Sequence, residues 1–235
     1  MSIKEQNKTK RGTINKYFFK LFLQRVIGFI LFALAAGTIK DLRGIINFSM
    51  YFIISIIVCI VMYKGHQETL YEREKKQENT KRWDKILLPM LVLLTYYGIY
   101  LVAGFGVRFK WMHLSDTWLY VGILIYLISS VFTVWPILEN RHFEATSRIQ
   151  DDREQTVIST GPYQIVRHPG YLGIIIWAIA TALIFGTLHV GITSTIIITI
   201  IIIRTYMEDT MLKKELSGYT CYTDKVKYRL FPFIW

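Results

Sequence analysis

The chain has 235 residues, of which 52% are hydrophobic, and it carries a formal net charge of +11. Several of its apolar runs approach about 20 residues, the length at which a helix crosses the hydrocarbon core of a bilayer. This pattern excludes an ordinary soluble domain and predicts one all-α integral membrane protein.

Four apolar runs occupy the first part of the chain, and we expect membrane helices at about 17–39, 45–63, 86–105 and 117–138. The polar segment 64–85 has mixed charge, and we interpret it as a solvated, helical connection with local Glu–Lys pairs. The N-terminal stretch "MSIKEQNKTKRGTINKYFFK" is too polar to begin a cleaved signal peptide. We therefore interpret it as a retained tail.

Two shorter apolar runs follow a polar block at 139–170 and cover about 171–186 and 189–203. Because only "TLH" and its neighbours separate them, they predict a tight helical hairpin whose ends lie on the same side. The predicted fold is thus about four transmembrane helices plus a C-terminal helical hairpin. We expect two regions, with N-terminal membrane helices at 1–138 and a chemically active region at 139–235.

The basic residues predict the orientation. If the N-terminus is cytoplasmic, only Lys40, Arg43, Arg108 and Lys110 lie outside, which is the asymmetry of the positive-inside rule. The polar block 139–170 and the C-terminus then also face the cytoplasm. Since anionic headgroups account for the positive charge, membrane lipids are expected partners and nucleic acid is not. The sequence carries no signal for an oligomeric state.

Cysteine and histidine spacing indicates neither a disulfide nor a metal site. Cys59 lies in an apolar run and Cys221 in a polar tail, so they are not expected to pair. The histidines are scattered, with no second ligand at helical spacing. We therefore expect no metal.

The stretch "RHPGY", residues 167–171, places a cation and an imidazole at the edge of an apolar run. Before it, "TVIST" at 156–160 is a candidate short strand, and "GPY" is a turn signal in which Gly161 is free to adopt unusual dihedral angles. Proline disfavours helix at the preceding residue and is favoured at the first helical position, so a helix should begin at Pro169. His168 and the free amides of that helix start predict a site for an anionic group.

Arg204 and Glu208 lie four residues apart at the end of the last apolar run and should share one helix face. Facing Arg167 and His168, they would form a polar pocket at headgroup depth. Spacing alone favours an interfacial salt bridge that anchors the helix end, with His168 as a structural capping residue.

Four elements in order, "GPYQIVRHPGYLG", a hairpin, "RTYMED" and "GYTCYTDKVKYRLFPFIW", resemble the isoprenylcysteine carboxyl methyltransferase family, which broadly includes related phospholipid methyltransferases. The similarity covers roughly 139–235, whereas 1–110 resembles only generic membrane spans. The resemblance implies S-adenosylmethionine-dependent methyl transfer in a membrane-embedded, non-Rossmann fold with a cytoplasmic cofactor pocket.

The resemblance also implies residue roles, with Arg204, Glu208 and His168 as catalytic candidates and Arg204 facing the acceptor. The family often has two consecutive glutamates where this chain has Glu208 and Asp209, and we expect little effect because the charge is kept. The implied cofactor contacts are Gln150, Gln155, Thr156, Val157, Ile158, Tyr163, His168, Pro169, Gly170, Tyr171 and Glu208.

These roles are chemically reasonable, since Glu208 suits the cofactor's ammonium or ribose hydroxyls, and Tyr163 and Tyr171 offer aromatic walls. A carboxylate acceptor is already an oxyanion and needs no general base, and Arg204 would orient it. Beside an amine acceptor, Arg204 would instead have to bind a phosphate. We therefore expect O-methyl transfer to a lipid-linked carboxylate, with phospholipid N-methylation as the first alternative.

Two other classes remain open. A sterol-reductase-like enzyme would bind NADPH, but its second cytoplasmic signature differs from "RTYMEDTMLKKEL". A membrane adaptor or transporter subunit would explain the spans but not the order of the polar residues. A transporter would also be expected to carry ionisable residues at the bilayer midplane, which the predicted spans lack.

Overall fold

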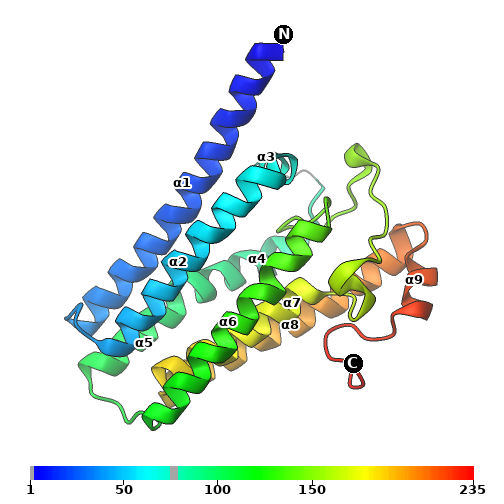
Figure 1. The fold of residues 1–235 in the computed structure, drawn as a ribbon. Helices are drawn as coiled ribbons and strands as arrows, with labels where there is room; N and C mark the ends of the chain where they lie inside the picture. The colour runs from blue at the N-terminus through cyan, green and yellow to red at the C-terminus, as the bar shows by residue number, and fades with distance from the viewer. Residues whose placement is uncertain (1–2, 75–78) are drawn as a thin grey trace.

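The computed structural model describes the backbone of residues 3–74 and 79–235 and the side chains from residue 11 onward, apart from 75–78. Within these residues the chain is helical and forms no strand, which confirms the all-α prediction (Figure 1). The elements are α1 (Ile3–Ala36), α2 (Leu42–Gly65), α3 (Gln67–Glu74), α4 (Asp84–Leu93), π-helical η1 (Leu94–Gly98), α5 (Ile99–Arg108), α6 (Asp116–Glu139), 3-10 helices η2 (Asp151–Arg153) and η3 (Gly161–Gln164), α7 (Pro169–Phe185), α8 (Leu188–Glu215) and α9 (Tyr219–Lys225).

Five helical segments in the described part of the chain are long and apolar enough to cross a membrane. Four of them correspond to the first four predicted runs, and the fifth is α8. α7 has 17 residues and is shorter. The spanning segments are Arg11–Ala36, Leu42–Gly65, Asp84–Arg108, Asp116–Glu139 and Leu188–Glu215.

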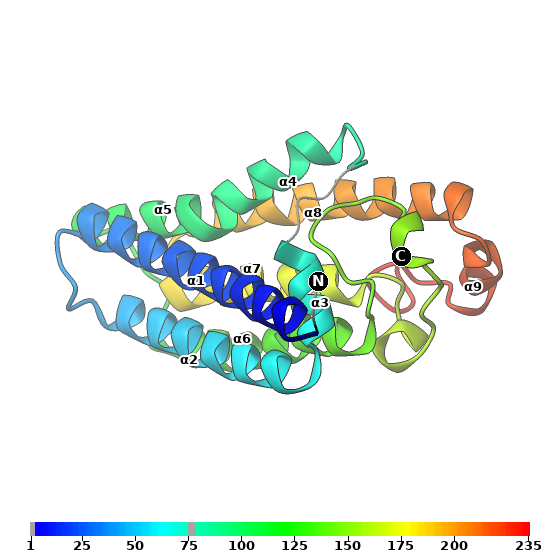
Figure 2. The ribbon, with the colours of Figure 1, turned by 90° about the horizontal axis from the view of Figure 1, so that it is seen from above.

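The helical hairpin is asymmetric, because α8 continues far beyond its apolar run. Its 28 residues correspond to about 42 Å of helix at 1.5 Å per residue. The polar extension carries Arg204, Glu208 and Asp209, so these side chains are held on a rigid helix rather than on a loop. Figure 2 shows the polar loops and α9 at one end of the bundle and the α1–α2 turn at the other.

The prediction of a strand at 156–160 is wrong. Residues 155–159 form no regular secondary structure and pair with no strand in the described structure. Val157 and Ile158 instead pack against the apolar side of α9 and the end of α8. The turn prediction is confirmed, since η3 begins at Gly161 with φ of +55°, and the predicted helix start at Pro169 is confirmed as well.

The polar connection after α2 is helical over α3, as predicted, but its ion pairs are not all local. Glu74 pairs with Lys20 of α1 at 2.5 Å and with Lys16 at 3.6 Å. These contacts tie α3 to the polar end of α1. Lys75 and Lys76, which contributed to the predicted local pairs, lie outside the described residues.

The ionisable side chain of Arg25 lies within the first candidate span, Arg11–Ala36. Its Nη1 donates to the Leu21 carbonyl at 2.9 Å, and its Nε donates to the Ser55 hydroxyl. The guanidinium also lies 4.8 Å from the centre of the Tyr51 ring. These contacts satisfy the guanidinium locally, as membrane-embedded cations require.

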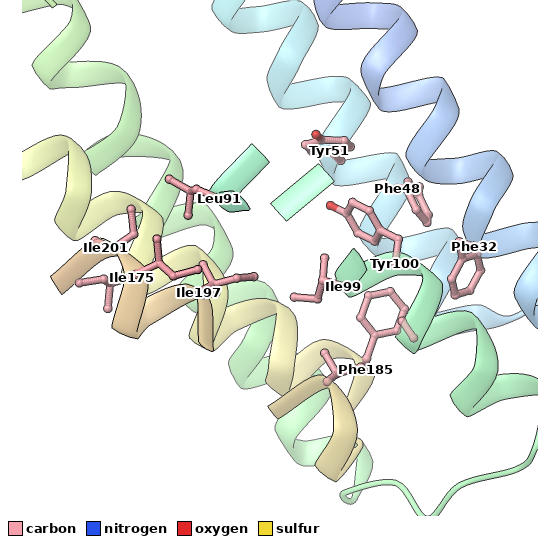
Figure 3. Packing of buried hydrophobic residues seen from close by; sticks show 14 of the residues in the cluster. Phe32, Phe48, Tyr51, Leu91, Ile99, Tyr100, Ile175, Phe185, Ile197 and Ile201 are labelled. Atoms are coloured by element: carbon pink, nitrogen blue, oxygen red, sulfur yellow. The ribbon is translucent and has the colours of Figure 1, made fainter. Parts of the chain in front are cut away.

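One hydrophobic core joins the two halves of the bundle. Aromatic side chains from α1, α2 and α5 meet aliphatic side chains from α7 and α8 (Figure 3). Ile99 and Phe185 lie between the two groups, and both are buried. The core therefore fixes α7 and α8, which carry the polar residues singled out in the sequence, against the N-terminal helices.

Glycine allows α7 to approach α6 closely. A methyl group added at Gly173 would lie 2.8 Å from the backbone of Phe132 and Thr133. Because the two helices would have to separate, we expect Gly173→Ala to lower the free energy of unfolding by about 1–3 kcal/mol. Thermal unfolding in detergent, followed by tryptophan fluorescence, measures this. Gly191→Ala on α8 is the control, since that position has open space around it, and equal unfolding temperatures for the two variants would contradict the expectation.

Candidate active site

A polar pocket of about 810 Å³, counting its open mouth, lies at the end of the bundle where the loops gather. Four segments form it: the loop between α6 and α7, the start of α7, the end of α8, and α9 (Figure 1). Its lining residues are Asn140, His142, Phe143, Glu144, Thr146, Ser147, Arg148, Gln150, Gln155, Thr156, Val157, Ile158, Tyr163, Arg167, His168, Pro169, Gly170, Tyr171, Glu208, Met211, Leu212, Leu216, Tyr219 and Tyr222.

The fold brings together the residues to which the sequence assigned a cofactor. Every one of them, from Gln150 to Glu208, lines this pocket. They come from two separate parts of the chain: residues 150–171, which run from the loop to the start of α7, and Glu208 of α8. That shared location supports a common ligand, although their individual contacts with it remain predictions.

Glu208 is held by two hydroxyl groups in the pocket wall. Its Oε2 accepts hydrogen bonds from Ser147 Oγ at 2.5 Å and from Tyr171 Oη at 2.6 Å. Its Oε1 faces His168 Nδ1 at 3.8 Å. The His168 and Tyr171 rings are nearly parallel, with centroids 5.7 Å apart. One carboxylate oxygen is therefore fixed, while the other is directed toward the imidazole side of the pocket.

His168 is positioned by its backbone as much as by its ring. Its amide donates to the Arg229 carbonyl at 2.9 Å, and its carbonyl accepts from the amides of Tyr171 and Leu172. These last two bonds use amides of the first turn of α7, so that turn offers an anion fewer donors than the sequence predicted. The ring Nε2 lies 3.5 Å from the Tyr219 hydroxyl.

Arg204 does not line the pocket. Its guanidinium is 3% exposed and forms a two-pronged contact with Asp84 of α4, with Nε to Oδ1 at 2.7 Å and Nη2 to Oδ2 at 3.1 Å. It also donates to the Ala145 carbonyl. The salt bridge that spacing allowed between Arg204 and Glu208 is replaced by this pair. Contact of Arg204 with an acceptor therefore stays a prediction, and it would require the guanidinium to leave Asp84.

Another wall of the pocket, formed by the loop after α6, was not predicted from the sequence. His142 Nδ1 and Thr146 Oγ1 are buried there and lack a hydrogen-bond partner within the described protein, so they are available to a ligand. Burial lowers the pKa of His142, and the nearby Arg153 and Arg141 lower it further. The only signal for His142 and Thr146 in the sequence is their position in the polar loop before "RHPGY".

The five candidate spans fit a multi-pass membrane protein, and the polar pocket lies at one end of its helical bundle. The model of the isoprenylcysteine carboxyl methyltransferase (ICMT) family matches residues 121–214, from α6 to the end of α8. This match confirms the resemblance to the ICMT family that was drawn from the motifs.

Two curated relatives match part of the chain. They are probable protein-S-isoprenylcysteine O-methyltransferases of Oryza sativa subsp. indica and subsp. japonica, each 34% identical over 71 residues. The aligned part is 29% of this chain and 37% of each relative. The chain thus matches little more than a third of the length of these relatives.

Proposed function

We propose that the protein is an S-adenosylmethionine-dependent methyltransferase that methylates a carboxylate on a lipid-linked acceptor. The main support for this proposal is that the residues matched by the family model include most of the residues that line the pocket. Residues 121–214 supply α7, α8 and most of the polar wall between them. The pocket also lies where spanning helices end, so a soluble cofactor and a lipid acceptor would reach it from different phases.

The pocket suits S-adenosylmethionine in its polar groups. Glu208 would bind the ammonium or the ribose hydroxyls, and the unpartnered His142 and Thr146 offer hydrogen bonds to a polar ligand edge. When bound, the cofactor supplies an activated methyl group. The residues that would hold it are those the sequence assigned: Gln150, Gln155, Thr156, Val157, Ile158, Tyr163, His168, Pro169, Gly170, Tyr171 and Glu208.

Alignment of the reactants is the main task left to the protein. A carboxylate acceptor is already ionised at pH 7, so the chain needs no general base and has to orient the acceptor in line with the methyl group. Glu208 and His168 line the pocket for this purpose, and Arg204 lies directly behind Tyr171, with its guanidinium 5.3 Å from the centre of that ring. We retain Arg204 as the proposed acceptor contact.

The orientation in the membrane is also part of the proposal. Most of the basic residues lie in the N-terminal tail, in the segment 64–85, in the loops around the pocket and at the polar end of α8, whereas the other end of the bundle carries few. By the positive-inside rule, the pocket, the N-terminus and the C-terminus face the cytoplasm. Residues 139–235 then form the region that carries the chemistry.

Binding of S-adenosylhomocysteine to the detergent-purified protein, followed by calorimetry, tests the cofactor. We expect one binding site per chain, and no binding in a folded sample would overturn the proposal. Labelled methyl transfer to a farnesylated cysteine and to phosphatidylethanolamine then distinguishes the acceptors. Base releases labelled methanol from a methyl ester but not from an N-methyl product. Binding of NADPH instead would favour the reductase alternative.

A further inference from the structure

Asp84 is a fully buried carboxylate at the start of α4. It lies outside the family-matched residues 121–214 and does not line the pocket. We propose that Asp84 is a positioning residue of the candidate active site, which holds Ser147 and Arg204 so that they fix Glu208 and Tyr171. The inference rests on the proposed function in assigning cofactor contact to Glu208.

Three charge-assisted hydrogen bonds converge on this carboxylate. Arg204 Nε donates to Oδ1 at 2.7 Å and Nη2 to Oδ2 at 3.1 Å, and the Ser147 amide donates to Oδ2 at 2.7 Å. A planar guanidinium that donates hydrogen bonds to both carboxylate oxygens has a defined orientation. Because Asp84 is 0% and Arg204 3% exposed, each ion depends on the other for compensation.

The two partners of Asp84 continue to the same carboxylate in the pocket. The Ser147 hydroxyl donates to Glu208 Oε2 at 2.5 Å, and the Tyr171 hydroxyl donates to the same oxygen at 2.6 Å. Arg204 lies over the Tyr171 ring at 5.3 Å. The contacts therefore form a closed ring of Asp84, Ser147, Glu208, Tyr171 and Arg204. Asp84 lies directly behind the wall residue Ser147 on one path, and behind Arg204 and then Tyr171 on the other.

The segment that Asp84 holds has little other regular structure to fix it. Residues 140–150 form no helix or strand in the described structure. The Lys81 amide donates to the Ser147 carbonyl at 3.1 Å, while Asp84 accepts from the Ser147 amide. Lys81 and Asp84 thus bond to the carbonyl and the amide of Ser147, and these contacts place the Ser147 hydroxyl at Glu208.

Loss of the Asp84 charge should disturb Glu208 in two ways. Ser147 would lose the carboxylate that fixes its backbone. Arg204 would be left as a buried cation, and the nearest acid on its own helix is Glu208, one turn further along α8. Both changes would draw Glu208 out of its present position in the pocket.

The test is calorimetric binding of S-adenosylhomocysteine to the full-length Asp84→Asn variant, with an expected rise in Kd of at least about tenfold. Arg204→Gln and the double variant complete the cycle, and the ring predicts that the double variant loses no more affinity than either single variant. Glu215→Gln is the matched control, because the exposed Lys81–Glu215 pair joins the same two segments outside the ring. Its Kd should stay within about twofold of wild type.

Hydrogen–deuterium exchange gives a readout that does not need the probe. The Asp84→Asn variant should exchange the amides of residues 144–148 at least about tenfold faster, whereas Glu215→Gln should not. Wild-type affinity in Asp84→Asn, or unchanged exchange, overturns the inference. Failure of the wild-type protein to bind the probe would instead overturn the proposed function, and the exchange of 144–148 would then decide the role of Asp84 alone.

A second variant covers the case in which Asp84→Asn does not fold. Arg204→Lys keeps the buried positive charge but cannot form the two-pronged contact. It should raise both the Kd and the exchange rate of residues 144–148, by less than Asp84→Asn would. Wild-type values for both measurements would overturn the inference.

Discussion

Replacement of Glu208 by glutamine should weaken binding of S-adenosylhomocysteine by about a hundredfold, or about 3 kcal/mol, the upper part of the range for hydrogen bonds to a charged group. Glutamine keeps the size of the side chain but removes the charge and turns one acceptor into a donor. Both hydroxyl donors of the wall, Ser147 and Tyr171, are used on Oε2. The loss would therefore fall on Oε1, the oxygen that faces the ring of His168 at 3.8 Å.

Calorimetry on the wild-type and variant proteins measures this difference, and thermal unfolding verifies that the variant is folded. Glu215→Gln is the control, since it removes the same charge from the same helix, two turns further along α8 and outside the pocket. An equal loss of affinity in the two variants would mean that general electrostatics, rather than a contact in the pocket, sets the binding. A folded Glu208→Gln variant with wild-type affinity would exclude Glu208 from the ligand site.

The membrane helices could be predicted from the sequence because the bilayer imposes one length on apolar runs. The ends of the helices could not. α1 begins at Ile3 and α8 reaches Glu215, because polar residues with good helix propensity continue the backbone hydrogen bonds past the apolar stretch. This difference matters for function, since the extension of α8 carries Glu208 and Asp209 into the polar region.

The polar pocket could be anticipated because its predicted residues lie close together in the chain, around "RHPGY", apart from Glu208. The partner of Arg204 could not be anticipated. Asp84 is 120 residues away, and no spacing in "WDKILL" distinguishes it from a solvated acid at a helix start. Long-range ion pairs of this kind depend on how helices pack, which hydrophobic periodicity alone does not specify.

The different surroundings of the adjacent acids Glu208 and Asp209 are a second feature that could not be predicted from the sequence. Successive helical residues point about 100° apart, so the two carboxylates face different surroundings. Glu208 faces the pocket, whereas Asp209 is buried against Arg167, Arg229 and Tyr219. The expectation that aspartate replaces a second glutamate with little effect considered charge alone. In the structure, the two carboxylates hold different groups. Glu208 accepts from Ser147 and Tyr171, whereas Asp209 accepts from Arg167 and Arg229.

Asp209 and Arg167 together tie the C-terminal segment to the start of α7. Arg167 Nε and Nη2 bind the two Asp209 oxygens at 2.7 and 3.1 Å, and Nη1 donates to the carbonyls of Val226 and Lys227. The Arg167 amide donates to the Tyr228 carbonyl at 2.9 Å. This one side chain therefore satisfies a buried acid and two buried or half-buried carbonyls. These contacts hold "RHPGY" against the C-terminal segment.

Substitution of Arg167 by glutamine should lower the free energy of unfolding by about 3–4 kcal/mol, because a buried pair loses one partner while the acid stays buried. For a chain of this size, that corresponds to a fall of about 10 °C in Tm. Tryptophan fluorescence during heating measures the change. Trypsin should also cut faster at Lys225, Lys227 and Arg229, since the segment loses its main anchor.

Lys213→Gln is the matched control for this prediction. Lys213 contacts the same Asp209 carboxylate at 3.4 Å, but its side chain is 38% exposed, so its removal should cost less than about 1 kcal/mol. A Tm for Arg167→Gln within about 2 °C of the Lys213→Gln value would contradict the expectation. It would mean that Arg229 and Tyr219 alone suffice to stabilise Asp209, and that backbone contacts rather than the buried guanidinium hold the C-terminal segment against His168.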